Sequence, residues 1–132
     1  MSTSSGTPLD LKGLRVLIVE DEELIAMLIE DFLVELGCDV VGPAATVAAA
    51  MPLAQSENIA GALLDLNLNG DPVYPVADSL AARGIPFIFT TGYAQEDVIA
   101  RHAGVPTLAK PFSSKLLQDT IVARFLGRTP AP

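Results

Sequence analysis

Gly61-Ala62-Leu63-Leu64-Asp65 is the stretch from which the fold of this chain can be worked out. Its apolar residues are small or branched and do not alternate with polar ones, which favours a strand buried on both faces, as in a parallel sheet. A carboxylate at the end of such a strand lies where open α/β sheets bind ligands. Taken alone, however, the segment is better explained by a strand that ends in an ordinary turn opened by Asp65.

Composition narrows the class of protein. The 132 residues suffice for one domain with a full core, and 50% of them are hydrophobic. The formal net charge of −8 argues against binding to nucleic acid or to an anionic membrane and suits a metal cation or a basic partner. A lone Cys38, the lack of a secretory signal and the lack of a long apolar run predict a cytoplasmic protein.

Apolar periodicity predicts five strands that alternate with five helices. The expected strands are 14–19, 39–42, 61–65, 85–91 and 105–109, and the expected helices are 24–36, 46–53, 76–83, 96–102 and 113–126. The first helix has Leu24 and Leu28 among its apolar positions, and the last has Leu116. Alternation of this kind predicts a parallel sheet with helices on both faces. Residues 1–11 are expected to form a flexible leader and 128–132 a tail, which leaves a domain at 12–127.

Polar residues follow four of these strands. Glu20 and Asp21 end the first strand, Asp65 the third and Thr91 the fourth, while Lys110 follows the fifth. Each has an ordinary explanation as a helix start, a turn or a surface loop. Because the carboxyl ends of parallel strands lie along one edge of the sheet, we expect all of them to converge.

This set of groups suits phosphoryl transfer. Clustered carboxylates repel one another, so a hard cation such as Mg²⁺ is expected among them. A carboxylate can also attack phosphorus as a nucleophile and form an acyl phosphate. The metal and a lysine would neutralise charge on the transferring group, and the hydroxyl of Thr91 could donate a hydrogen bond to it.

Four motifs resemble those of the receiver domain of two-component response regulators. They are Val19-Glu20-Asp21-Glu22, Leu64-Asp65, Thr91-Gly92 and Lys110-Pro111-Phe112, and the resemblance covers roughly residues 14–126. It implies a flavodoxin-like, doubly wound, five-stranded parallel sheet in the order 2-1-3-4-5.

The resemblance also implies a role for each matching residue. Asp65 would accept a phosphoryl group from a histidine kinase. Asp21 would bind Mg²⁺, with help from Glu20, from Asp65 and from the backbone carbonyl of Asn67. Thr91 would be the switch hydroxyl, and Lys110 would pair with the phosphate, held by a cis peptide bond to Pro111.

Several positions depart from the family pattern. Glu20 stands where the family usually has Asp, Asn69 where many members have Pro, and Thr107 where an aromatic switch residue is usual. The intervals around Thr91 are short, so the fourth helix is expected to be short or displaced. Tyr93 is hypothesised to cover the phosphorylation site or to replace the missing switch aromatic.

His102 has no neighbouring metal ligands in the sequence and is interpreted as a surface or capping residue.

The resulting interpretation is a stand-alone response regulator that signals rather than an enzyme that turns over substrate. Its expected partners are a sensor histidine kinase or histidine phosphotransfer protein and an unidentified downstream protein, with no nucleic acid or membrane. A degenerate receiver that binds proteins without phosphorylation is the alternative. A small phosphohydrolase is disfavoured because Asn67 stands where a proton-donating acid is needed, and a flavin-binding protein is disfavoured by the carboxylates.

Overall fold

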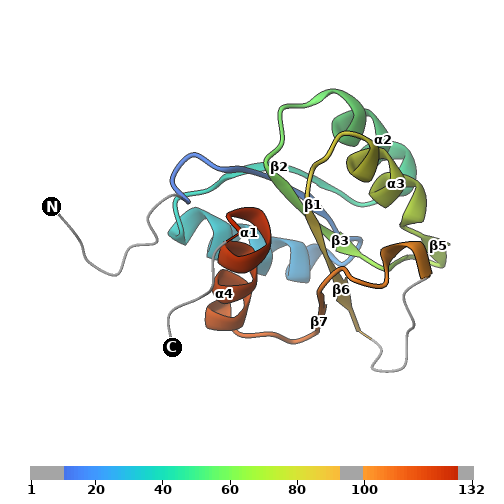
Figure 1. Cartoon of the computed structure of the whole chain (residues 1–132). Coiled ribbons are helices and arrows are strands. Elements are labelled where there is room, and N and C mark those ends of the chain that lie inside the picture. Colours follow the sequence, from blue (N-terminus) through green and yellow to red (C-terminus); the bar gives the residue numbers. More distant parts are fainter. Residues whose placement is uncertain (1–10, 93–99, 128–132) are drawn as a thin grey trace, which may run out of the picture.

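A five-stranded parallel sheet in the order β2-β1-β3-β6-β7 carries the fold (Figure 1). The computed structural model describes residues 11–92 and 100–127. The strands are β1 (Arg15–Val19), β2 (Asp39–Ala44), β3 (Gly61–Asp65), β6 (Phe87–Thr91) and β7 (Thr107–Ala109). Because β4 and β5 form a separate small hairpin, this order is the 2-1-3-4-5 order expected from the sequence, and that prediction is confirmed.

The small hairpin follows β3 directly, where the segment taken alone favoured an ordinary turn opened by Asp65. It pairs β4 (Asn67–Leu68) with β5 (Asp71–Pro72) in antiparallel register. Its two-residue turn is Asn69-Gly70, and both residues have positive φ angles, 54° and 90°. Asn-Gly is the dipeptide that such tight hairpin turns favour. The buried side chain of Leu68 anchors the hairpin in the core.

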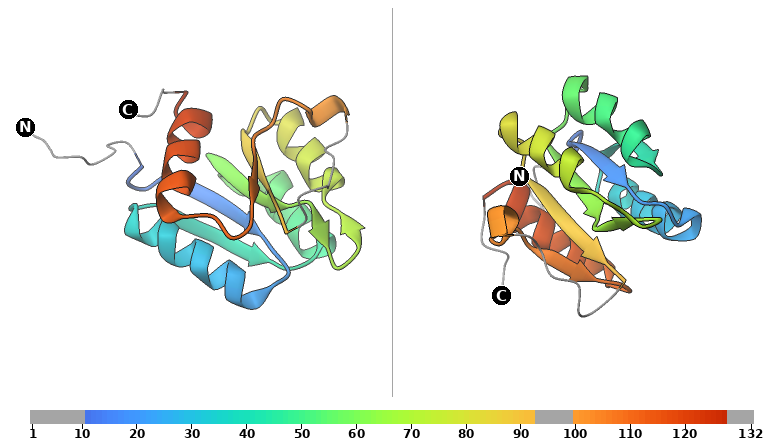
Figure 2. Two further views of the ribbon diagram at one scale, coloured as in Figure 1. Left: turned by 90° about the horizontal axis from the view of Figure 1, so that it is seen from below. Right: turned by 90° about the vertical axis from the view of Figure 1, so that its right-hand side faces the viewer.

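In the part of the chain that the structure describes, four α-helices cover the sheet, two on each face (Figure 2). Helices α1 (Glu23–Glu35) and α4 (Ser114–Phe125) lie on one face, and α2 (Val47–Ser56) and α3 (Tyr74–Ala82) lie on the other. Each face of the sheet has its own hydrophobic core, and alternate residues of β1 point into the two cores. Val16 and Ile18 pack beneath α1 and α4, whereas Leu17 and Val19 pack beneath α2 and α3. This division follows from the two-residue period of a strand.

Local capping explains where two of the helices begin. The hydroxyl of Thr46 accepts a hydrogen bond from the amide of Ala49 at the start of α2, and that of Ser113 accepts one from the amide of Leu116 at the start of α4, both at 3.0 Å. These bonds satisfy amides that have no partner within the helix. Thr46 and Ser113 are the first residues of the two helix ranges expected from the sequence, 46–53 and 113–126.

Three apolar residues expected on buried helix faces are exposed instead. Leu24 and Leu28 of α1 are 77% and 54% exposed, and Leu116 of α4 is 47% exposed. A helix on one face of a sheet buries only a stripe of its surface, which in α1 runs through Ala26, Ile29 and Leu33. Leu11, the last residue of the expected leader, is buried in the core beneath α1 and α4.

The connection from β6 to β7 contains, in its described part, a 3₁₀ turn η1 (Ala100–His102). The prediction that His102 is a surface or capping residue is wrong, because its side chain is 7% exposed. Its Nε2 atom lies 2.8 Å from Oδ1 of Asp78 on α3, and Arg101 donates two hydrogen bonds of 2.9 Å to the same carboxylate. The imidazole ring packs among the rings of Tyr74, Phe87 and Phe89.

In the described ranges, every helix is too short or too polar to span a bilayer.

Candidate functional site

The carboxyl ends of the strands meet around a cleft of about 450 Å³. β1 leads into Glu20 and Asp21, β3 ends at Asp65, β6 ends at Thr91, and Lys110 follows β7. The residues lining the cleft are Asp21, Glu22, Asp65, Asn67, Asn69, Gly70, Gly92 and Lys110. The predicted convergence of distant polar residues at this edge of the sheet is therefore observed.

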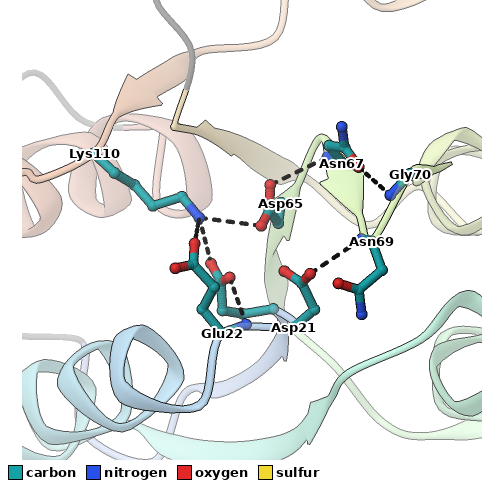
Figure 3. Close-up of polar contacts among 8 residues, drawn as sticks. Asp21, Glu22, Asp65, Asn67, Asn69, Gly70 and Lys110 are labelled. Carbon is teal, nitrogen blue, oxygen red and sulfur yellow. Dashed lines mark hydrogen bonds and ion pairs between the residues drawn. The ribbon is translucent and has the colours of Figure 1, made fainter.

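Lys110 is the centre of the contacts in this cleft (Figure 3). Its ammonium donates hydrogen bonds to Oε1 of Glu20 at 2.8 Å and to Oδ2 of Asp65 at 3.1 Å. Oε1 of Glu22 lies 3.7 Å from the same nitrogen. The side chains of Lys110, Glu20 and Asp65 are all less than a tenth exposed, so these charges interact with little solvent between them.

Backbone amides hold three of the carboxylates in place, and the amide of Glu22 donates to Oε2 of Glu20 at 3.0 Å. The amide of Asn67 donates to Oδ1 of Asp65 at 3.1 Å, which restrains rotation of the carboxylate. The amide of Asn69, in the turn of the β4–β5 hairpin, donates to Oδ2 of Asp21 at 3.0 Å. Oδ1 of Asn67 in turn accepts from the amide of Gly70. The hairpin thus forms one wall of the cleft and supports Asp21 (Figure 3).

Burial changes the titration of this site. Desolvation raises the pKa of Glu20 to about 7, although hydrogen bonds from Lys110 and from the amide of Glu22 act in the opposite direction. For Lys110, burial alone would lower the pKa, but the hydrogen bonds to Glu20 and Asp65 outweigh it and raise the pKa above its ordinary value. The lysine is therefore a permanent positive charge at neutral pH.

Three carboxylates fit a divalent cation. One oxygen from each of Glu20, Asp21 and Asp65 can be chosen so that all three lie within 4.8 Å of one another. Hard oxygen donors without sulfur or imidazole are the ligand set of Mg²⁺. These residues therefore fit the metal that the resemblance implies.

Thr91 and Pro111 are the remaining predicted site residues that the structure describes. Thr91 is buried at the end of β6, and its carbonyl accepts a 2.8 Å hydrogen bond from the amide of Lys110. The Lys110–Pro111 peptide bond is cis. Tyr93 lies outside the described residues, so the hypothesis about its ring stays a prediction.

Glu22 and Asn69 also lie at the cleft, although no site contact was predicted for either residue. The Asn69-Gly70 dipeptide was an available signal, because it is a strong marker of a tight hairpin. No comparable signal distinguishes Glu22 within the acidic run that begins at Glu20.

The fold and the cleft together are those of a receiver domain, and comparison with known proteins agrees. The family model for the response regulator receiver domain matches residues 16–122, so the chain belongs to this family. Receiver domains are signalling modules rather than classical enzymes, and they bind Mg²⁺ in the active site.

Individual relatives are regulators and receiver domains. The chain is 35% identical to the transcriptional regulatory protein PdtaR of Mycobacterium tuberculosis in an alignment of 118 residues that covers 84% of this chain and 58% of that protein. It thus spans little more than half the length of this curated relative.

Two solved structures extend the comparison. The solution structure of SdrG from Sphingomonas melonis Fr1 is 44% identical with a TM-score of 0.76, covering 84% of this chain and 95% of that one. The receiver domain of the sensor histidine kinase PA1611 from Pseudomonas aeruginosa PAO1, which has a magnesium ion in its active-site cleft, is 29% identical with a TM-score of 0.74. That match covers 88% of this chain and 99% of the other.

Proposed function

We propose that this chain is a response regulator of a two-component phosphorelay that accepts a phosphoryl group on Asp65. The observation that carries the proposal is the position of Lys110, whose ammonium joins the carboxylates of Glu20 and Asp65 in a buried cleft. Ninety positions separate Lys110 from Glu20 in the sequence. A purely structural role explains poorly why the chain gathers several charges at one edge of its sheet.

In the proposed reaction, a carboxylate oxygen of Asp65 attacks the phosphorus of a phosphohistidine. The new P–O bond forms as the P–N bond breaks, and the electron pair leaves on the imidazole nitrogen of the donor. The amide of Asn67 holds the carboxylate, and the Lys110 ammonium is positioned to pair with the oxygens of the transferred group. Thr91 would donate its hydroxyl to the same group.

Mg²⁺ would be held by Glu20, Asp21 and Asp65, with the carbonyl of Asn67 as a further ligand. It would supply positive charge that offsets the negative charge of the phosphoryl oxygens. The donor proposed is a sensor histidine kinase or a histidine phosphotransfer protein. The output proposed is contact with a further protein or onward phosphate relay.

The test is intact-mass measurement after incubation with Mg²⁺ and acetyl phosphate, beside Asp65→Asn. We expect a single phosphoryl adduct on the natural chain that is absent from the variant and absent when Mg²⁺ is removed by a chelator. If acetyl phosphate gives no adduct, transfer from a phosphorylated histidine kinase is measured next. Failure with both donors would contradict the proposal and favour a module that binds partners without phosphorylation.

A further inference from the structure

Glu22 occupies an unusual position at the mouth of the cleft. It is the residue that precedes the first turn of α1, yet its side chain makes no capping hydrogen bond to the helix. Its carboxylate reaches instead toward Lys110, with 3.7 Å between Oε1 and Nζ (Figure 3). The side chain is 63% exposed, in contrast to the buried Glu20 and Asp65 on the same ammonium.

Glu22 also stands between two differently lined cavities. One is the polar cleft that contains Asp65. The other is an apolar groove of about 260 Å³ between α1 and the segment after Lys110, lined by residues such as Leu28 and Phe112. Both cavities count Glu22 among their lining residues, so a donor that enters the cleft from the groove side passes this carboxylate.

The negative charge of Glu22 at the mouth of the cleft opposes the approach of an anionic phosphoryl donor. A phosphoryl group must approach Asp65 and Lys110 while Glu22 adds a negative charge beside the ammonium. The carboxylate of Glu22 has a second effect of the same sign, because it competes with the incoming phosphoryl oxygens for Lys110. Since Glu22 is largely exposed, both effects act through solvent and should be weakened by salt.

We propose that Glu22 determines donor specificity by slowing phosphorylation of Asp65 by small free anions and so favouring donors that bring their own positive charge. This inference rests on the proposed function of Asp65. With acetyl phosphate, an oxygen of Asp65 bonds to phosphorus while the P–O bond to the acetyl group breaks. Acetate leaves with the electron pair, and no proton transfer is needed.

Glu23 provides a matched control. It is the adjacent residue, carries the same charge, is exposed and begins α1, and none of its hydrogen bonds or ion pairs involves Lys110 in the described structure. Glu22→Gln and Glu23→Gln therefore remove the same charge from the same helix end. A general effect of net charge or of the helix dipole should appear in both variants.

The experiment measures initial phosphorylation rates by intact mass for the natural chain, E22Q and E23Q at saturating Mg²⁺. With acetyl phosphate, a dianion near neutral pH, E22Q should react about threefold faster at low salt, and E23Q should react at nearly the natural rate. With phosphoramidate, which carries less negative charge, the gain in E22Q should be smaller. Raising the salt to about 1 M should remove most of the gain, which a purely structural change would not do.

Equal rates for the natural chain and E22Q, or equal gains in E22Q and E23Q, would overturn the inference and leave the proposed function intact. A gain that does not depend on salt would overturn it as well. An absence of adduct from the small donors on all three proteins is a case of equal rates and overturns the inference, whereas the proposed function is overturned only if transfer from a phosphorylated histidine kinase fails as well. Thermal melting of each variant controls for folding, and the high exposure of Glu22 predicts little change.

Discussion

Glu20 shows how burial alters the chemistry of a single side chain. A glutamate ordinarily titrates near 4.5, but desolvation raises the pKa of Glu20 to about 7 in the folded chain. Between these two pH values the folded chain keeps a proton that the unfolded chain has released. Glu20 therefore contributes stability that declines as pH rises from about 5 to 7, in the absence of metal.

The same titration predicts how Mg²⁺ should stabilise the protein. Below pH 7 the metal must displace a proton from Glu20, whereas above pH 7 it meets a carboxylate. The rise in melting temperature at fixed Mg²⁺ should be clearly larger at pH 8 than at pH 5.5, with apparent affinity on the order of tenfold weaker at the lower pH. Glu20→Gln should reduce this rise and flatten its pH dependence. Equal rises at both pH values in the natural chain would refute the prediction.

At the scale of elements, the turn η1 is fastened to α3 by one carboxylate. Asp78 accepts from Arg101 and contacts His102, and its pKa is lowered first by the bond from Arg101 and then by that from His102. Because His102 is buried among aromatic rings, the contact fixes the position of η1 ahead of β7.

Asp78→Ala should lower the free energy of unfolding by about 1 kcal/mol, because it leaves the ring nitrogen of His102 buried without this acceptor. The control is Asp119→Ala on α4. The Asp119 side chain is 35% exposed, against 45% for Asp78, but its partner Lys115 is 78% exposed. Asp119→Ala should therefore lower the free energy of unfolding by only about 0.3 kcal/mol. Urea unfolding with unchanged m-values measures the free energy of unfolding of both variants. If the two variants lose the same amount, the burial of His102 adds no stability to its contact with Asp78.

At the scale of the whole molecule, the sheet and the last helix meet at Gly61. A Cβ atom on Gly61, at the start of β3, would lie 2.5 to 2.6 Å from ring carbons of Phe125 at the end of α4. The ring must therefore move before any larger residue fits there. This contact joins the strand that carries Asp65 to the C-terminal end of the described chain.

Gly61→Ala should therefore lower the free energy of unfolding by about 1–3 kcal/mol, because the added methyl group overpacks the site. The same substitution made in a Phe125→Ala background should cost less than about 0.5 kcal/mol, since the clashing ring is gone. A double-mutant cycle from denaturant unfolding measures the coupling between the two positions. A cost that is the same in both backgrounds would show that the ring is not the obstacle.

Much of this architecture could be predicted from local sequence. The buried strands and the caps at Thr46 and Ser113 follow from apolar patterns and from residue types within a few positions of one another. The strand order was implied instead by the resemblance of four motifs to those of receiver domains. The location of the site at one edge of the sheet could also be predicted, because a parallel sheet brings the carboxyl ends of its strands together whatever their separation in the chain.

Other features required the folded chain. The exposure of Leu24 and Leu116, the burial of His102 against Asp78 and the contact of Glu22 with Lys110 are set by which side chains arrive from distant segments. The raised pKa of Glu20 has the same origin, since the environment that desolvates it is assembled from several strands. Periodicity reports which face of an element is apolar, but solvent exposure and electrostatics depend on everything packed around that element.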